Sequence, residues 1–222
     1  MKKISLIFFG AVSGGELFSA LYDFPLLHTI CKPALLITLL GYYFFSLREQ
    51  NERPSPVLMM ALIFSWGGDV LLMGSGELYF MLGLASFLTA HVFYIFTFRQ
   101  FCDEDDTNAL RGVQRLRFAF PIILYGTGLV VILYPHLGEL TVSVLLYALV
   151  LTVMVLNALF RFGRTVTPSF VMVFGGAILF MISDSLLAVN KFIEPVTLSG
   201  FWILSTYICA QFLIVSGLLK YR

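Results

Sequence analysis

Eight apolar stretches, each long enough to cross a lipid bilayer as an α-helix, divide this chain from end to end. A helix needs about 20 mostly apolar residues to span the hydrocarbon core, and such stretches lie near residues 4–22, 26–47, 56–73, 78–98, 116–134, 140–160, 168–189 and 198–219. Hydrophobic residues make up 59% of the 222 residues and charged residues 12%, whereas soluble domains have about 45–50% and about 25%. The sequence therefore predicts an all-α, polytopic membrane helix bundle with eight transmembrane helices, in a single domain over residues 1–222.

The first apolar stretch has some features of a cleavable signal peptide. Lys2 and Lys3 precede an apolar run, and Phe18-Ser19-Ala20 is an acceptable cleavage site. Glu16, however, is out of place in the apolar region of such a peptide. We therefore expect this segment to stay in the protein as its first span.

The positive charges predict how the helices are oriented. If the N-terminus lies inside the cell, twelve of the 14 Lys and Arg residues fall in inner segments, Lys191 falls in an outer turn, and Lys32 lies within a span. Inner loops of membrane proteins carry an excess of Lys and Arg. We therefore expect both termini to be cytoplasmic, which agrees with an even number of spans, in the inner or plasma membrane if the source is bacterial.

One extended polar segment, residues 102–117, joins the fourth and fifth spans and contains Asp103-Glu104-Asp105-Asp106. We expect a solvated linker, with a docking or regulatory loop as the alternative. The linker separates four spans from four. Gly68-Asp69 in the third span and Ser183-Asp184 in the seventh are each followed by a Leu-Leu pair at the same spacing. Because four is an even number, two such halves would have the same topology, as in a 4+4 parallel repeat.

Ionisable residues on four of the predicted helices fall at one depth, in the outer third of the bilayer, if each residue rises about 1.5 Å. This layer consists of Glu16, Lys32, Asp69 and Asp184. An ionisable group inside a membrane span indicates function by default, and pairing between opposite charges would offset much of the cost of burying them. His91 and Tyr94, one turn apart in the fourth span, lie deeper, as do Asn157 and Gln211.

Three interpretations of this polar layer remain open: a structural network that holds the bundle together, a catalytic site, or a transport path. The chain has no Gly-x-Ser-x-Gly motif, which argues against a serine hydrolase. Neither the histidines nor the cysteines have the spacing of a zinc site; they are His28, His91, His136, Cys31, Cys102 and Cys209. With a net charge of +1 and no basic patch interleaved with aromatic residues, we expect no nucleic-acid partner.

A set of short motifs, taken in order, resembles a known family of membrane proteins, the YhhN-type lysoplasmalogenase family. The motifs are Lys32-Pro33, Gly68-Asp69-Val70-Leu71-Leu72, Ala90-His91-Val92-Phe93-Tyr94-Ile95, Ser183-Asp184-Ser185 with Asn190, and Gln211. The resemblance covers nearly the whole chain, from about Glu16 to Gln211. Members of the family are multi-span hydrolases that cut the vinyl ether bond of lysoplasmalogens into a fatty aldehyde and a glycerophospho-ethanolamine or -choline.

The resemblance implies a lysoplasmalogen and water as substrates, membrane lipid as the surroundings, and no metal or organic cofactor. Vinyl ether hydrolysis needs an acid and a group that stabilises a cation, as two carboxyl groups do in glycosidases. We expect Asp184 or Asp69 to donate the proton while the other stabilises the cation or activates water. His91 would assist proton transfer. Supporting or substrate-binding roles are expected for Lys32, Glu16, Tyr94, Ser183, Asn190 and Gln211.

A proton-coupled transporter that uses the same carboxylates is the alternative. It would be favoured by helices that are broken at matching positions of both halves, as at Gly67-Gly68 and Gly175-Gly176. The oligomeric state is left open.

Overall fold

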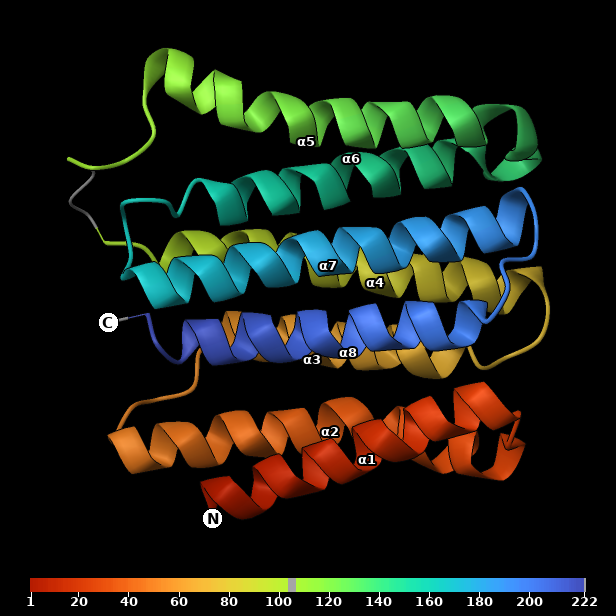
Figure 1. The fold of residues 1–222 in the computed structure, drawn as a ribbon, viewed down its shortest axis with the longest axis horizontal. Coiled ribbons are helices and arrows are strands. Elements are labelled where there is room, and N and C mark those ends of the chain that lie inside the picture. Colours follow the sequence, from red (N-terminus) through yellow and green to blue (C-terminus); the bar gives the residue numbers. More distant parts are fainter. Residues whose placement is uncertain (104–106, 222) are drawn as a thin grey trace. The chain divides into compact units, whose positions relative to one another are not determined.

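Each of the eight apolar stretches forms an α-helix in the computed structural model, which describes residues 1–103 and 107–221 (Figure 1). The helices are α1 (Lys2–Tyr22), α2 (Pro25–Gln50), α3 (Pro56–Leu71), α4 (Glu77–Gln100), α5 (Gly112–Leu133), α6 (Thr141–Leu159), α7 (Thr167–Phe192) and α8 (Ser199–Leu218). Two 3₁₀-helices, η1 (Tyr134–His136) and η2 (Gly138–Leu140), connect α5 to α6. The predicted helices are confirmed, and their ends differ from the expected ones by at most four residues. Glu104, Asp105, Asp106 and Arg222 lie outside the described residues.

Seven of these helices in the described part of the chain are long and apolar enough to cross a membrane. The remaining one, α3, has 16 residues and is shorter than the usual span of about 20. Length and hydropathy thus support an integral, multi-pass membrane protein.

Proline and left-handed residues set several helix ends. Pro25, Pro56 and Pro168 each stand in the first turn of a helix, where the missing N–H costs nothing because that group has no partner within the helix. At the C-terminal ends of α1 and α2, Asp23 and Asn51 adopt left-handed conformations with φ near 56° and 55°. This conformation lets backbone N–H groups beyond the helix bind its last carbonyl groups.

The chain folds into two compact units, Met1–Tyr94 and Ile95–Arg222. The boundary lies within α4 and not at the polar linker. The single-domain organisation therefore stays a prediction, and each unit is described by itself.

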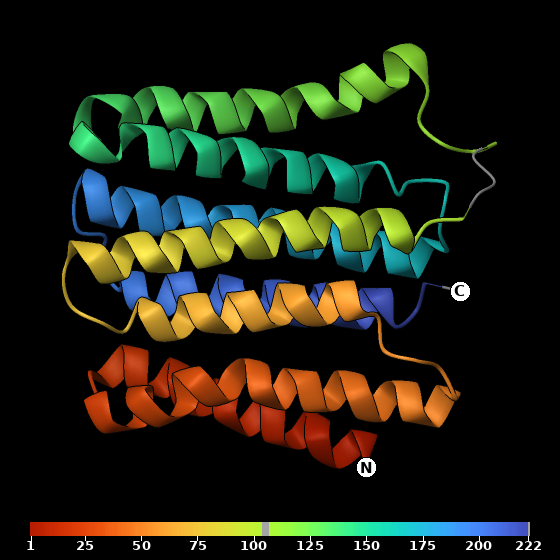
Figure 2. The same cartoon turned by 180° about the vertical axis from the view of Figure 1, so that it is seen from behind.

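In the first unit, α1 and α2 form an antiparallel hairpin joined by a short turn (Figures 1 and 2). The indole Nε1 of Trp66 in α3 donates to the carbonyl oxygen of Pro33 in α2 over 2.9 Å. Between α3 and α4, a Cβ atom at Gly68 would come within 2.5 Å of the Phe87 ring. Only glycine therefore allows α3 to approach α4 this closely at that point.

In the second unit, α7 and α8 form a closely packed antiparallel hairpin (Figure 1). A Cβ atom at Gly176 would lie 2.8 Å from the carbonyl oxygen of Ala210 and 3.0 Å from the backbone nitrogen of Ile214. Backbone atoms of a packed helix cannot move aside individually. The absence of a side chain at Gly176 therefore sets the distance between the two helices, as small residues do in many membrane helix pairs.

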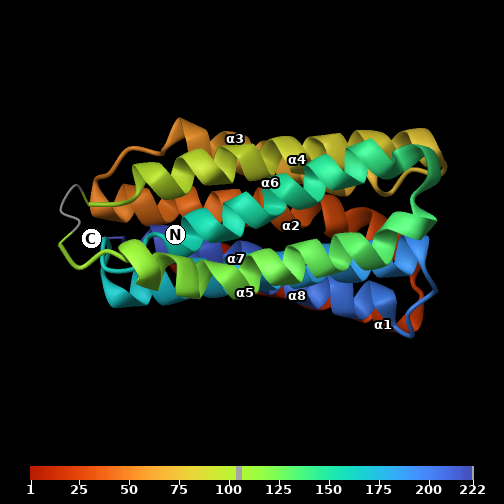
Figure 3. The same ribbon diagram turned by 90° about the horizontal axis from the view of Figure 1, so that it is seen from above.

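The segment after α4 is bound to the turn between α6 and α7, and these parts lie at one end of the second unit (Figure 3). Arg161, which is fully buried, donates from Nε and Nη2 to the carbonyl oxygen of Phe101 over 3.2 and 3.1 Å and from Nη2 to Ser169 Oγ over 3.0 Å. Arg164 donates from Nη2 to the carbonyl oxygen of Asp103 over 2.9 Å. Burial lowers the pKa of Arg161 from its ordinary value, but a guanidinium titrates so far above neutral pH that it stays charged.

The predicted linker over residues 102–117 is therefore wrong at its C-terminal end, because α5 begins at Gly112. The physical reason is a contact that sequence spacing does not show. The Arg115 guanidinium lies 3.9 Å from the centre of the Phe160 ring, and this cation–π contact stabilises the first turn of α5 against α6.

We predict that Gly176→Ala destabilises the protein by roughly 1–3 kcal/mol, because overpacking forces the backbones of α7 and α8 apart. Gly175→Ala is the matched control, since a Cβ atom at Gly175 meets nothing within 4 Å. The measurement is the thermal unfolding of both purified variants in detergent. Equal melting temperatures for the two variants would contradict the packing described here.

Candidate functional site

Asp184 in α7 accepts a short hydrogen bond from a buried tyrosine. The phenol oxygen of Tyr147 in α6 donates to Asp184 Oδ2 over 2.6 Å. Tyr147 is buried, whereas Asp184 is half-buried. The Asp184 carboxyl group is thus held in a defined orientation by a neighbouring helix.

Two other candidate residues of the second unit make contacts that hold helices and turns. Ser183 Oγ donates to the carbonyl oxygen of Ile203 in α8 over 2.9 Å. Asn190 Oδ1 accepts from the backbone N–H of Val196 over 2.9 Å, in the turn between α7 and α8. Ser183 and Asn190 thus fix the hairpin on which Asp184 stands.

Gln211, in contrast, lies within a small group of polar side chains on α8. It is almost fully buried, and its Nε2 lies 3.3 Å from the phenol oxygen of Tyr207, one turn earlier in the same helix. The Tyr207 ring also packs edge-on against Phe180 of α7, with 5.4 Å between ring centres. This contact positions the phenol of Tyr207 beside α7, the helix that carries Asp184.

Asp69 lies near the end of α3 and is 3% exposed. It follows Gly68, the residue that brings α3 against Phe87 of α4. His91 and Tyr94 are both fully buried and lie four and seven residues beyond Phe87, which places all three on one face of α4. The first unit therefore carries a buried carboxyl group, an imidazole and a phenol on α3 and the adjacent helix α4.

Glu16 is fully buried in α1, and its partner comes from α2. Glu16 Oε1 lies 2.7 Å from Nδ1 of His28, whose side chain is 34% exposed. Lys32, one turn further along α2, is close enough to Glu16 for an electrostatic interaction. The structure thus brings Glu16 and Lys32 together, as the common depth of the charged layer predicted.

The remaining pairing within that layer, between Asp69 and Asp184, stays a prediction because the two residues belong to different units. Two relevant residues were missed in the sequence. Tyr147 is the single tyrosine of its span, which is only a weak signal. His28 was considered only as a zinc ligand, although its place one turn before Lys32 puts both side chains on the same face of α2.

We predict that His28→Ala lowers stability more than its exposure suggests, by about 1–3 kcal/mol, because it leaves a buried carboxyl group without its partner. Glu16→Gln in the same protein should recover part of this loss, because the double variant no longer buries an unpaired acid. The measurement is a double-mutant cycle on thermal or denaturant unfolding in detergent. Additive effects would show that the Glu16–His28 contact contributes no coupling energy.

Comparison with known proteins finds a family model and several named relatives that match most of this chain. The family model described as the YhhN family matches residues 27–218, a range that begins after Glu16 and includes the other candidate residues. The human protein named lysoplasmalogenase TMEM86A is 30% identical over 177 residues, which cover 74% of this chain and 66% of the relative. The Mycobacterium tuberculosis protein named lysoplasmalogenase is 31% identical over 166 residues, or 72% of this chain and 59% of the relative.

A third relative, human lysoplasmalogenase TMEM86B, is 28% identical over 164 residues, which cover 74% of this chain and 64% of the relative. The chain thus spans about two thirds or less of the length of these curated relatives. No solved structure matches. Because the family model extends over most of the chain, from the start of α2 to the end of α8, we conclude that this protein belongs to the YhhN family.

Proposed function

We propose that this protein hydrolyses the vinyl ether bond of lysoplasmalogens, releasing a fatty aldehyde and a glycerophospho-ethanolamine or -choline. The observation that carries the proposal is the similarity, at about 30% identity over roughly three quarters of the chain, to proteins named lysoplasmalogenase. The abundance of apolar helices is consistent with a substrate that resides in a membrane.

The chemistry of the reaction defines which groups the protein must supply. An acid protonates the vinyl carbon that is β to the ether oxygen, and the positive charge is shared between the adjacent carbon and that oxygen. Water adds to the carbon and loses a proton, which gives a hemiacetal. The hemiacetal then loses the glycerol oxygen as an alcohol and becomes the aldehyde. One proton is taken up and one is released, so the reaction needs no net oxidant or reductant.

Carboxyl groups suit both the proton transfer and the stabilisation of the cation, as they do in glycosidases. We assign the proton donor to Asp184 and the second carboxyl role to Asp69. The Tyr147 phenol supports this assignment, because its hydrogen bond to Oδ2 holds the Asp184 carboxyl in one orientation. His91 and Tyr94 would orient water, and Lys32 would contact the substrate phosphate.

We also propose that α3 crosses the membrane, so that the protein has eight spans with both termini in the cytoplasm. Helical turns continue past Leu71, since the backbone N–H groups of Leu72, Met73 and Gly74 bind the carbonyl oxygens of Gly68, Val70 and Leu71. This lengthens the apolar segment toward the usual span. The excess of Lys and Arg in alternate turns supports the orientation.

A 4+4 parallel repeat completes this proposal. It is supported by the residue before each aspartate, which plays the same structural part in both units. Gly68 lets α3 pack on the next helix, at Phe87, and Ser183 binds the next helix at the carbonyl oxygen of Ile203.

The central test is fatty-aldehyde release from a lysoplasmalogen by the purified protein. We expect release by the wild type and a decrease of about 10²-fold or more in Asp184→Asn and in Asp69→Asn, the range that general acid–base groups contribute. Asp23→Asn makes the same chemical change in an exposed turn and should retain full activity. Release at wild-type rates by both folded variants would refute the carboxyl mechanism, and no release by well-folded wild type would refute the activity.

Tyr147→Phe tests the positioning of Asp184. We expect kcat to fall about tenfold with little change in KM, because the loss of a hydrogen bond to a carboxyl group weakens catalysis and not lipid binding. The pH profile of kcat should also shift, which a purely structural role would not produce. Tyr125→Phe removes a phenol oxygen from an exposed position and serves as the control; equal effects of the two substitutions would reject the positioning role.

A further inference from the structure

The buried face of α1 is polar toward its C-terminal end. Its buried residues recur at helical spacing and are Phe9, Ser13, Glu16 and Ser19. Ser13 Oγ and Glu16 Oε2 have no hydrogen-bond partner among the described residues. A buried polar atom without a partner in the protein normally binds water or a small polar ligand. The two atoms stand one helical turn apart and therefore mark a place that accepts a small polar molecule within the first unit.

His28 of α2 contacts the same carboxylate and remains accessible. Its Nδ1 lies 2.7 Å from Glu16 Oε1, and its side chain is 34% exposed although Glu16 is fully buried. Within the described residues, Glu16 is the one hydrogen-bonding or ionic partner of the His28 side chain, and Nε2 is not among the buried atoms that lack a partner. The imidazole is thus held at Nδ1 by a buried carboxylate and is open at Nε2.

A carboxylate that accepts a hydrogen bond from Nδ1 determines where an imidazole can react. The contact places the proton of the neutral ring on Nδ1 and the lone pair on Nε2, as in the Asp–His pairs of serine proteases. Histidine is also the side chain that takes up and releases protons near neutral pH. A purely structural role explains the contact at Nδ1 but not the opening at Nε2, so the geometry is that of a general base.

Asp69, to which we assign the second carboxyl role, lies at the same level of the first unit. Helix α3 runs antiparallel to α2 (Figure 2), and the Trp66 indole binds the carbonyl oxygen of Pro33. Asp69 follows Trp66 by about 4.5 Å, at 1.5 Å per residue, in the direction of the start of α2. His28 and Lys32 precede Pro33 by about 7.5 Å and about 1.5 Å on the same basis. Asp69 is therefore level with the turn of α2 that carries both residues.

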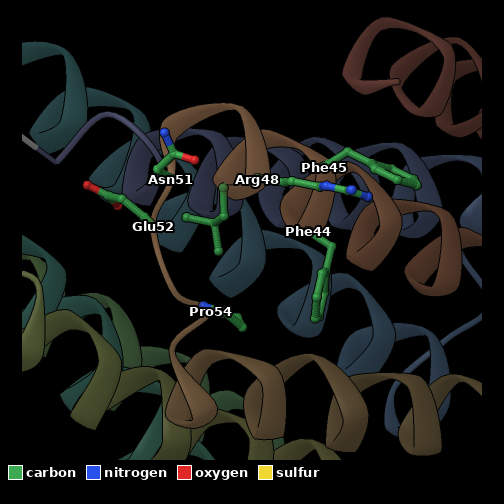
Figure 4. A pocket seen from close by; sticks show the side chains of 7 residues that line it. Phe44, Phe45, Arg48, Asn51, Glu52 and Pro54 are labelled. Atoms are coloured by element: carbon green, nitrogen blue, oxygen red, sulfur yellow. The ribbon is translucent and has the colours of Figure 1, made fainter.

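The other end of α2 has a cavity, but its charged side chains do not converge. The cavity has a volume of about 400 Å³, and its lining includes Arg48 and Glu52. These two side chains are exposed and point away from each other (Figure 4). The polar groups that meet one another are those at the start of α2, where Glu16 contacts His28.

We propose that His28 is a general base of the hydrolysis and that Glu16 is its positioning residue. This inference rests on the proposed vinyl ether hydrolysis. As the oxygen of water bonds to the cationic carbon, His28 Nε2 takes one of its protons, and the electrons of the carbon–oxygen double bond return to the ether oxygen. The imidazolium then gives this proton to the glycerol oxygen as the hemiacetal bond to that oxygen breaks. The hydroxyl proton of the hemiacetal returns to the carboxylate that donated the first proton, so every group regains its initial state.

The test measures aldehyde release by purified full-length variants in detergent. His28→Ala should lower kcat about 10²-fold or more, the usual contribution of a general base, and added imidazole should restore part of this activity because the position of Nε2 is accessible. His28→Asn should lower kcat equally but keep a near-wild-type melting temperature, since its amide still offers Glu16 an N–H donor. His136→Ala removes an imidazole from an exposed position in η1 and, as the matched control, should retain full activity.

Glu16→Gln tests the positioning role. The amide can present either an acceptor or a donor to Nδ1, so the ring is no longer held in one tautomer. We expect kcat to fall about tenfold with little change in KM. Nitrogen NMR spectra of protein with labelled histidine should show the Nδ1–H form of His28 in the wild type and a mixture of tautomers in the variant. Glu139→Gln makes the same change at an exposed position of η2 and should alter neither readout.

Three results would each overturn the role of His28 while the wild type still releases aldehyde. They are wild-type rates in folded His28→Ala or His28→Asn, a loss that imidazole does not restore in folded His28→Ala, and an Nε2–H tautomer in the wild type. No release by well-folded wild type would instead refute the hydrolase proposal itself, and this inference with it. The activity of the wild type therefore distinguishes the two failures.

Discussion

The low polarity of a lipid bilayer requires that polar side chains on membrane helices find partners within the protein, and the main features of this fold satisfy that requirement. In the first unit, the fully buried carboxyl group of Glu16 is paired with His28 across the α1–α2 hairpin. In the second unit, Asp184 receives the phenol hydrogen bond of Tyr147 across α6 and α7. In hydrocarbon such contacts replace the water that would otherwise solvate the groups. Each of these two carboxyl groups is therefore also a link between neighbouring helices.

Close helix packing in both units depends on positions without a side chain. Gly68 and Gly176 allow contacts that any larger residue would prevent, and both helices run without interruption through these glycines. The glycine pairs that could have broken α3 and α7 in a transporter lie within continuous helices, and one glycine of each pair, Gly68 or Gly176, serves packing. At these positions α3 and α7 therefore lack the matched breaks that the transporter interpretation would require.

The polar composition of the segment after α4 does not by itself make it a flexible loop. Arg161 and Arg164 bind backbone carbonyl groups at the end of α4, so the segment that follows α4 is tied to the turn between α6 and α7. A Cβ atom at Gly163, whose φ is +70°, would collide with the backbone of Asn108, which shows how closely the two segments approach. The buried guanidinium of Arg161 thus has a structural role that its place among the basic turn residues does not reveal.

Sequence alone was sufficient for the eight helices and for the family, because bilayer-length apolar stretches and the short motifs are local features of the chain. The proximity of Glu16 and Lys32 also followed from depth, since short turns bring consecutive helices together. The Tyr147–Asp184 bond, the buried role of Arg161 and the early start of α5 came only from the tertiary structure. Each depends on which faces of neighbouring helices and turns meet. Neither hydropathy nor spacing specifies how a helix is rotated about its own axis when it is apolar on every side.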